Sequence, residues 1–172
     1  MMHGAINMKV KELLIAEWER ESANTKRMLQ AIPEEKLSWK PHEKSKELGA
    51  LAYHVAGIPE RWAYILDHDV FDPTVVKAQP QPDSKEGIVS MFESGSAALM
   101  ELLNRTGEAD YGREFTFEIK GRRQFTMPRA MGISTMLMGH LIHHRAQISV
   151  YLRLLNVPVP GMYGPSADDN PE

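Results

Sequence analysis

Apolar residues recur every three to four positions in four stretches of the chain, and segments rich in proline, glycine and charge separate these stretches. This spacing predicts an amphipathic helix in each stretch, because residues three and four apart share one helix face. The predicted helices span about 7–31, from 45 or 46 to about 68, 84–105 and 128–155. Four such helices indicate an all-α four-helix bundle. The length of 172 residues suits one folding unit, so we expect a single domain over residues 1–172.

Prolines and capping residues refine this helix pattern. Pro59 lies inside the second helix, where it removes a backbone donor and clashes with the preceding turn, so it predicts a kink around 57–59. Asp83 or Ser84 is suited to cap the third helix, and Pro128 suits the first turn of the fourth. The positions expected to face the core are Leu14, Trp18 and Met28 in the first helix, Leu51, Val55 and Trp62 in the second, Ile88, Phe92 and Leu102 in the third, and Ile133, Leu137, Leu141 and Ile148 in the fourth.

Two segments do not follow the helical spacing. The stretch REFTFEIKGRRQFTMP alternates apolar and polar residues on either side of a glycine, which predicts a short β-hairpin between the third and fourth helices. Phe115, Phe117 and Ile119 would share one face of it. The tail NVPVPGMYGPSADDNPE has too many prolines for a continuous helix, and we expect it to pack as an extended strap.

The composition excludes several classes of protein. The chain is 42% hydrophobic and 25% charged with a formal net charge of −3, which is typical of a globular protein. No run of lysine and arginine forms a phosphate-binding stripe, so nucleic acid is not an expected partner. No apolar segment approaches the roughly 20 residues of a membrane span, and no secretory signal is visible at the N-terminus. We therefore expect a cytoplasmic location without membrane attachment.

The chain contains no cysteine. This excludes disulfides, thiolate metal ligands and a cysteine nucleophile together. Any metal site must therefore use histidine, aspartate or glutamate. Any thiol chemistry must use a thiol supplied from outside.

The stretch HLIHHRAQ in the fourth helix concentrates the candidate chemistry. At about 100° per residue, His144 falls within the inward apolar face, His140 at its edge and His143 outside it. Imidazoles at positions i and i+4 lie one turn apart and can share one ion at Zn–N distances of about 2.0–2.1 Å. The alternative is a pair of hydrogen-bonded helix histidines without a metal.

A third histidine strengthens the metal interpretation. His54 lies at the edge of the inward face of the second helix, where a facing helix could meet it. His3, His42 and His68 are expected to be solvated surface residues. Three neutral imidazoles would leave a divalent ion with its full charge and at least one open position, the arrangement of a catalytic site. The open position could activate water, a thiolate or a carbonyl oxygen, and histidine ligation suits Zn, Ni, Cu or Fe.

Three further polar residues are candidates for the surroundings of this site. Gln147 could orient a ligand imidazole or hold a bound water, or it could be an ordinary polar residue at the helix boundary. Arg145 could form a structural salt bridge or bind the acidic part of a cosubstrate. Glu21 interrupts the apolar face of the first helix. It could reach solvent, pair with an arginine, or face a wet cavity near the metal as a general base.

The order of these elements resembles the DinB-like proteins, also called the DinB/YfiT superfamily, over nearly the whole chain. The family pattern is a histidine in the second helix followed by H-x-x-x-H-R-x-Q in the last, and here it corresponds to His54, His140, His144, Arg145 and Gln147. The segment VPVPGMYG, which follows the last helix, also resembles the corresponding segment of the family. Ala146 stands where glycine is common in the family, a minor departure.

The resemblance implies more than the residue pattern does. It implies an up-down-down-up bundle, usually a homodimer, that holds a divalent metal ion, often nickel or zinc, through the three histidines. Family members with known activity are metal-dependent transferases that use low-molecular-weight thiols such as bacillithiol, mycothiol or glutathione, and others are described as metal-dependent hydrolases. We therefore expect a metal-dependent enzyme acting on a small-molecule substrate, as a thiol S-transferase or a hydrolase. The alternative is a non-catalytic, dimeric, stress-associated binding module with an idle metal site.

Overall fold

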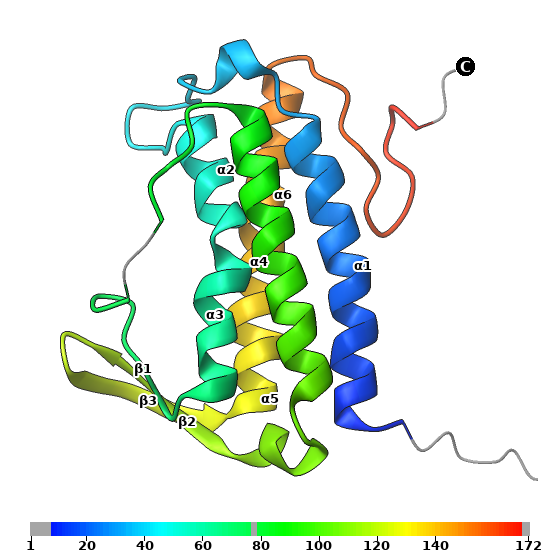
Figure 1. Ribbon diagram of the computed structural model, residues 1–172. Helices are drawn as coiled ribbons and strands as arrows, with labels where there is room; N and C mark the ends of the chain where they lie inside the picture. The colour runs from blue at the N-terminus through cyan, green and yellow to red at the C-terminus, as the bar shows by residue number, and fades with distance from the viewer. Residues whose placement is uncertain (1–7, 77–78, 170–172) are drawn as a thin grey trace, which may run out of the picture.

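The computed structural model describes residues 8–76 and 79–169, and its helices form a bundle with a small sheet at one end (Figure 1). The elements in chain order are α1 (Val10–Gln30), η1 (Glu34–Lys36), α2 (Leu48–Ala56), α3 (Ile58–Asp67), β1 (Val70–Phe71), α4 (Lys85–Arg105), η2 (Glu108–Gly112), β2 (Glu114–Ile119), β3 (Arg122–Pro128), α5 (Arg129–Met131), η3 (Gly132–Gly139) and α6 (His140–Leu154). The expected four-helix architecture and the hairpin before the last helix are confirmed. The expected helix start at Asn7 lies outside the described residues.

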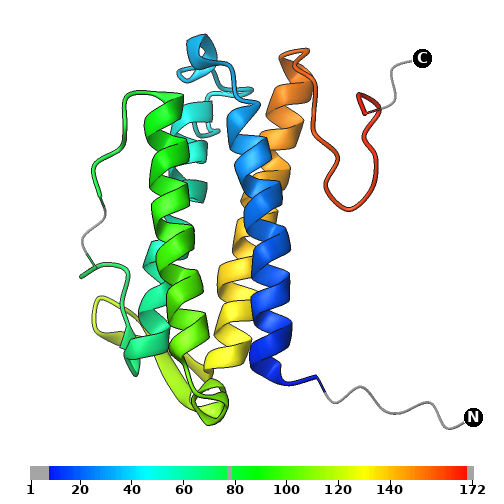
Figure 2. The same ribbon diagram turned by 45° about the vertical axis from the view of Figure 1, so that its right-hand side comes forward.

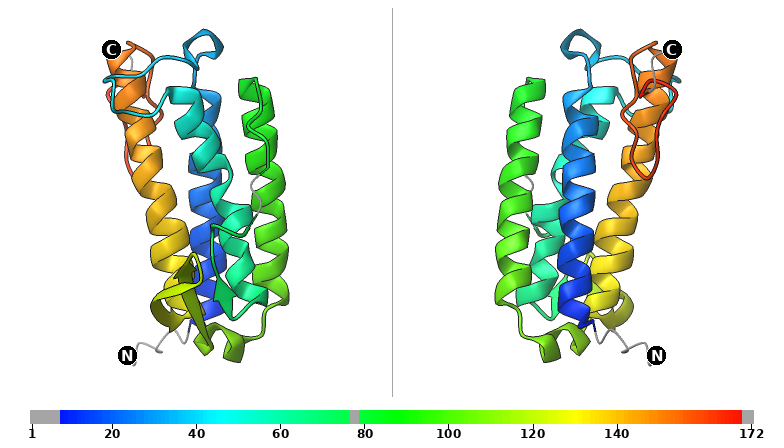
Figure 3. Two further views of the ribbon diagram at one scale, coloured as in Figure 1. Left: turned by 90° about the vertical axis from the view of Figure 1, so that its left-hand side faces the viewer. Right: turned by 90° about the vertical axis from the view of Figure 1, so that its right-hand side faces the viewer.

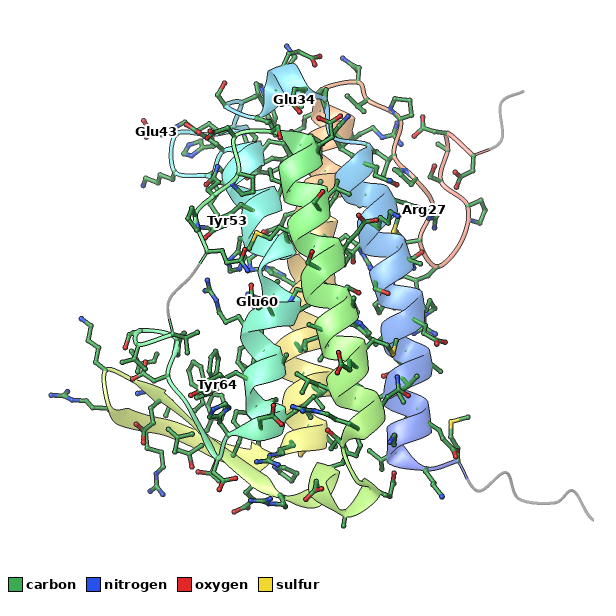
Figure 4. All side chains as sticks on the ribbon, in the orientation of Figure 1. Arg27, Glu34, Glu43, Tyr53, Glu60 and Tyr64 are labelled. Carbon is green, nitrogen blue, oxygen red and sulfur yellow. The ribbon has the colours of Figure 1, made fainter. Side chains whose placement is uncertain are left out.

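The topology is up-down-down-up, as the resemblance implied. In Figure 1 the chain rises in α1, descends through α2 and α3, and descends again in α4 before it rises through α5, η3 and α6. Because α3 and α4 run the same way, a long crossover after β1 returns the chain along the outside of the bundle. Gln79 ties this crossover to the bundle, because its carbonyl oxygen accepts from the Tyr53 hydroxyl and its amide donates to Glu60. Tyr53 and Glu60 are labelled in Figure 4.

The helices close around a continuous apolar core. α4 packs against α1 and α3, and α6 packs against α2 and α1, as the views in Figures 2 and 3 show. Trp18 of α1 and Phe92 of α4 are fully buried and tilted against each other, with ring centroids 6.4 Å apart. Burying an apolar side chain such as Phe92 stabilises the fold by about 1.5–3 kcal/mol. The positions expected to face inward are buried, except that Leu103 replaces Leu102 as the fully buried leucine near the end of α4.

The kink predicted in the second helix is a break between α2 and α3. Pro59 lies in the first turn of α3 and has no N–H to donate to the preceding turn, so the helical ladder is interrupted there. The backbone on either side stays nearly helical, because Gly57 donates to the carbonyl of Tyr53 and Arg61 donates to that of Gly57. Residues of α2 and α3 therefore keep a common inward face across the break.

The last helix departs from the prediction of an uninterrupted α-helix over 128–155. The segment η3 is π-helical, with wider turns than an α-helix, and it lies between α5 and α6. Its first residue is tightly packed: a Cβ added at Gly132 would lie 2.4 Å from the Phe115 ring and 2.9 Å from Ile65. The apolar residues Ile133, Leu137 and Leu141 are spaced four apart, which fits this wider winding as well as an α-helix, so periodicity does not reveal it. The α-helical geometry resumes at His140, so the spacing of the histidines is unaffected.

The hairpin of β2 and β3 turns at Lys120 and Gly121, both with positive φ, as a two-residue connection requires. A bulge follows Phe117, and Ile119 at the tip is 41% exposed. The face predicted for Phe115, Phe117 and Ile119 therefore ends at the bulge. β1 adds a parallel strand beside β2 that the sequence did not predict, because two residues are too few to show a pattern.

The tail after α6 turns back beside the bundle on the side of α1 and α6, as expected of a strap (Figure 2). Arg27 extends from α1 toward this tail (Figure 4) and donates to the carbonyl oxygen of Gly161 at 2.7 Å. Asn24 donates to the carbonyl oxygen of Met162 at 3.4 Å. In the described part of the chain, none of the helices combines the length and apolar character that crossing a bilayer requires.

Candidate metal site

Three histidine side chains meet between α2 and α6. His54 comes from α2, and His140 and His144 come from the first two turns of α6; all three are half-buried. Nε2 of His54 lies 3.1 Å from Nε2 of His140. The ring centroids of the three pairs are 5.0, 4.5 and 4.6 Å apart. One ring nitrogen from each histidine lies within 4.8 Å of the other two, so the structure brings together all three residues expected from the sequence.

This triangle of nitrogens fits a divalent transition-metal ion. Two nitrogens bound to one tetrahedral zinc ion at about 2.0–2.1 Å lie about 3.3 Å apart, close to the observed 3.1 Å. The same separation also suits a hydrogen bond in which one ring donates to the other. Among the described residues, no carboxylate joins the three histidines. A metal ion held here would therefore keep at least one coordination position for a further ligand.

The surroundings keep two of the imidazoles neutral. Burial, followed by the charges of His144, His140, Lys46 and Arg61, lowers the pKa of His54 from 6.5 to about 4. Burial and the charges of His144, His143 and Arg61 lower the pKa of His140 to about 4 as well. Because a histidine binds metal through a neutral ring nitrogen, both rings are prepared for ligation at neutral pH.

Gln147 orients His144. Nδ1 of His144 donates to the side-chain oxygen of Gln147 at 2.7 Å, which leaves Nε2 of His144 as the nitrogen with a free lone pair. The amide nitrogen of Gln147 donates in turn to Nε2 of His143 at 3.3 Å. His143 is exposed and lies outside the group of three, as its position on the helix predicted. Gln147 thus fixes the tautomer of His144 through the ring nitrogen that would not bind a metal ion.

Glu21 and Arg145 form a buried ion pair between α1 and α6. Nη2 of Arg145 lies 2.7 Å from Oε2 of Glu21, and both side chains are almost completely buried, at 2% and 1% exposure. Tyr163 of the tail closes the pair, because its hydroxyl donates to Glu21 and accepts from Arg145, both at 2.9 Å. Arg145 also donates to the hydroxyl of Thr25. Burial raises the pKa of Glu21, but hydrogen bonds from Tyr163 and Arg145 outweigh it, so the pKa lies below its ordinary value.

The ion pair decides between the roles that the sequence left open for these two residues. Glu21 pairs with an arginine, and its carboxylate oxygens accept from Arg145, Tyr163 and Arg20. A general base must be free to take a proton from a reacting group. Both oxygens of this carboxylate already accept hydrogen bonds from neighbouring side chains. The structure thus shows the salt-bridge alternative for both residues. Their contacts join α1, α6 and the tail.

Sequence analysis missed three residues around these sites. Tyr163 lies in the strap, where no periodic pattern indicates a contact. Lys46 and Arg61 act on the histidines from the segment before α2 and from α3. Of the three, only Arg61 could have been found from the sequence. It follows His54 by seven residues, a spacing that places both on the same side of the helical column.

An up-down-down-up helical bundle with three histidine nitrogens converging between two of its columns defines a class of helical proteins with a candidate metal site. The chain belongs to the DinB family, whose model matches residues 7–171. It is 27% identical over 153 residues to the uncharacterized protein YrdA of Bacillus subtilis strain 168. The aligned region covers 88% of this chain and 87% of that protein.

Solved structures agree with this assignment. A DinB-like protein from Bacillus cereus ATCC 10987 superposes with a TM-score of 0.70 and 25% identity, over 87% of this chain and 95% of that one. The H52A mutant of a mycothiol-dependent maleylpyruvate isomerase superposes with a TM-score of 0.50 and 12% identity, over 87% of this chain and 62% of that one. The second likeness shows a shared fold only.

Proposed function

We propose that this DinB-family chain binds one divalent transition-metal ion, nickel or zinc, through His54, His140 and His144, and that it uses the ion in an enzymatic reaction of a small molecule. The observation that carries this proposal is the approach of the three ring nitrogens to within 4.8 Å of one another, from two helices. The hydrogen bond from His144 to Gln147 supports it, because it leaves the lone pair of Nε2 free to bind an ion. When bound, the ion would supply a Lewis acid with room for one ligand from solution.

Two reactions fit this arrangement, thiol S-transfer and hydrolysis. The chain has no cysteine, so a thiol would come from a low-molecular-weight cosubstrate. The resemblance to DinB-like proteins that use low-molecular-weight thiols favours a thiol as cosubstrate. The residues of this chain would contribute three imidazoles, the orientation of one of them by Gln147, and a half-buried setting that limits access of water. The resemblance to the family also supports a homodimer, which light scattering would show as twice the mass of the chain.

A turnover screen tests the enzymatic part of the proposal. Protein loaded with nickel or zinc is mixed with small electrophiles and esters, with and without a thiol such as glutathione. We expect turnover that is lost on treatment with a chelator and in His144→Gln, but not in His42→Gln, which changes an exposed histidine in a loop. Stoichiometric metal without turnover by any thiol or ester would instead favour the non-catalytic binding module.

A further inference from the structure

Arg61 of α3 lies on the same side of the helical column as His54. The two residues are seven positions apart, which is about two helical turns, and the nearly helical backbone across Gly57 keeps their directions aligned. Because side chains of a helix tilt toward its N-terminus, we expect the long side chain of Arg61 to lie toward His54. α3 also packs against η3, the segment that leads directly into His140.

Arg61 is half-buried and has no partner within the described chain. Within residues 8–76 and 79–169, which the structure describes, its guanidinium group forms no ion pair and no hydrogen bond. The neighbouring carboxylate of Glu60 accepts from Gln79 instead, at 2.9 and 2.8 Å (Figure 4). A guanidinium group that loses part of its hydration without gaining an anion is costly, and an anionic ligand would remove that cost.

Two cationic side chains lie along the helical column that carries His54. Arg61 lies about two turns beyond His54, in α3 and on the same side, and Lys46 lies shortly before the first residue of α2. These cations attract small anions toward the site, and a bound divalent ion would increase that attraction.

We propose that Arg61 binds the carboxylate of the small molecule that uses the histidine site, so that its substrate or cosubstrate is a carboxylate-bearing anion. The planar guanidinium group can hold a carboxylate through two parallel hydrogen bonds. This inference rests on the proposed function, because a second group of the same molecule would take the open position of the ion. Arg61 is thus a specificity-determining residue, whereas the histidines hold the ion.

Two thiols of similar size test this assignment. 3-Mercaptopropionate carries a carboxylate and 2-mercaptoethanol does not, and either thiolate gives a charge-transfer band when it binds Co²⁺. Titrating each thiol into the Co²⁺-loaded protein gives a ratio of dissociation constants. We expect the wild type to bind 3-mercaptopropionate at least about tenfold more tightly, the range for one hydrogen-bonded charge. In Arg61→Gln the ratio should fall to near one, with Co²⁺ still bound.

Two variants control for net charge and for geometry. Arg123→Gln removes an exposed arginine of β3 and should keep the wild-type ratio. Arg61→Lys keeps the charge without the planar fork and should restore part of the preference. Equal binding of the two thiols by the wild type, or an unchanged ratio in Arg61→Gln, would overturn the role of Arg61 alone. A wild-type protein that takes up no Co²⁺ would overturn the proposed function itself.

Discussion

The side-chain oxygen of Gln147 lies 2.7 Å from Nδ1 of His144 and accepts its proton. This contact fixes which nitrogen of His144 carries hydrogen, and the lone pair of Nε2 is left free for a ligand. Since i and i+3 residues of a helix are neighbours, α6 supplies both the imidazole and the group that orients it.

Replacing Gln147 by leucine should therefore weaken metal binding without removing a ligand. We expect the affinity for Zn²⁺ to fall about 10–100-fold, the usual effect of deleting a group that orients a ligand histidine. Competition with a chromophoric chelator measures the affinity. Gln124→Leu, an exposed change in the hairpin, serves as the control and should leave the affinity unchanged. An unaltered affinity in Gln147→Leu would show that His144 is oriented by other means.

The low pKa values of His54 and His140 predict a pH-dependent stability of the metal-free protein. Both values are about 4 in the folded chain and rise toward 6.5 on unfolding. Between these values the unfolded state binds more protons, so the free energy of unfolding should fall as the pH drops from about 6.5 to about 4. Urea unfolding of chelator-treated protein at a series of pH values measures this slope.

The variant His54→Gln measures how much of the pH dependence of the free energy of unfolding comes from the histidine site. In His54→Gln one of the two shifted groups is absent, and the loss of stability between pH 6.5 and 4.5 should be smaller than in the wild type. His42→Gln should retain the full slope, because His42 is exposed and lies away from the group. If His54→Gln and the wild type lose the same stability over this range, His54 does not titrate as proposed.

The buried pair of Glu21 and Arg145 predicts a large and asymmetric effect on stability. Arg145→Met leaves the carboxylate of Glu21 buried without its partner, which should reduce the free energy of unfolding by about 3–5 kcal/mol. The double variant Glu21→Leu, Arg145→Met removes both charges and should be more stable than Arg145→Met alone.

The exposed pair of Arg153 and Asp168 provides the comparison on the same helix. Arg153 is 52% exposed, so Arg153→Met should change the free energy of unfolding by at most about 1 kcal/mol. Chemical denaturation of the three variants checks these values. Similar losses in Arg145→Met and Arg153→Met would mean that the buried pair has no special weight in the fold.

The close packing at Gly132 predicts a different response at the two glycines that bound η3. Gly132→Ala should reduce the free energy of unfolding by about 1–3 kcal/mol, because the new Cβ would clash with the rings and methyl groups of Phe115 and Ile65. Gly139→Ala meets no atom closer than 3.6 Å and should be neutral or stabilising by up to about 1 kcal/mol. Equal effects of the two substitutions in thermal unfolding would rule out this packing argument.

Much of the fold follows from apolar spacing alone. The helical spacing placed Trp18, Phe92 and Leu141 on inward faces, and Pro59 located the break between α2 and α3. The π-helical η3 and the strand β1 were missed because neither leaves a mark on the apolar pattern: one is a local change of winding and the other spans two residues. Both arise from tertiary packing, which spacing along one helix cannot report.

Part of the candidate site could likewise be predicted from the sequence, and part could not. The angles along α6 separated His140 and His144 from His143, because α-helical geometry is regular there. The partner of Glu21 could not be chosen from the sequence, since that choice depends on how α1 and α6 are rotated relative to each other. Tyr163, which completes this pair, lies in a strap without periodicity. Arg61 could have been found from its spacing of seven residues from His54 in the same predicted helix.

Elemental analysis of the purified protein tests the central claim most directly. The wild type, exposed to Ni²⁺ or Zn²⁺ and then freed of loosely bound ions by dialysis, should contain one metal ion per chain. His54→Ala, His140→Ala and His144→Ala should each lose it while keeping the helical circular dichroism signal, and His143→Ala should retain it. A wild type without stoichiometric metal, or a His144→Ala variant that still holds the ion, would contradict a metal site at these three histidines.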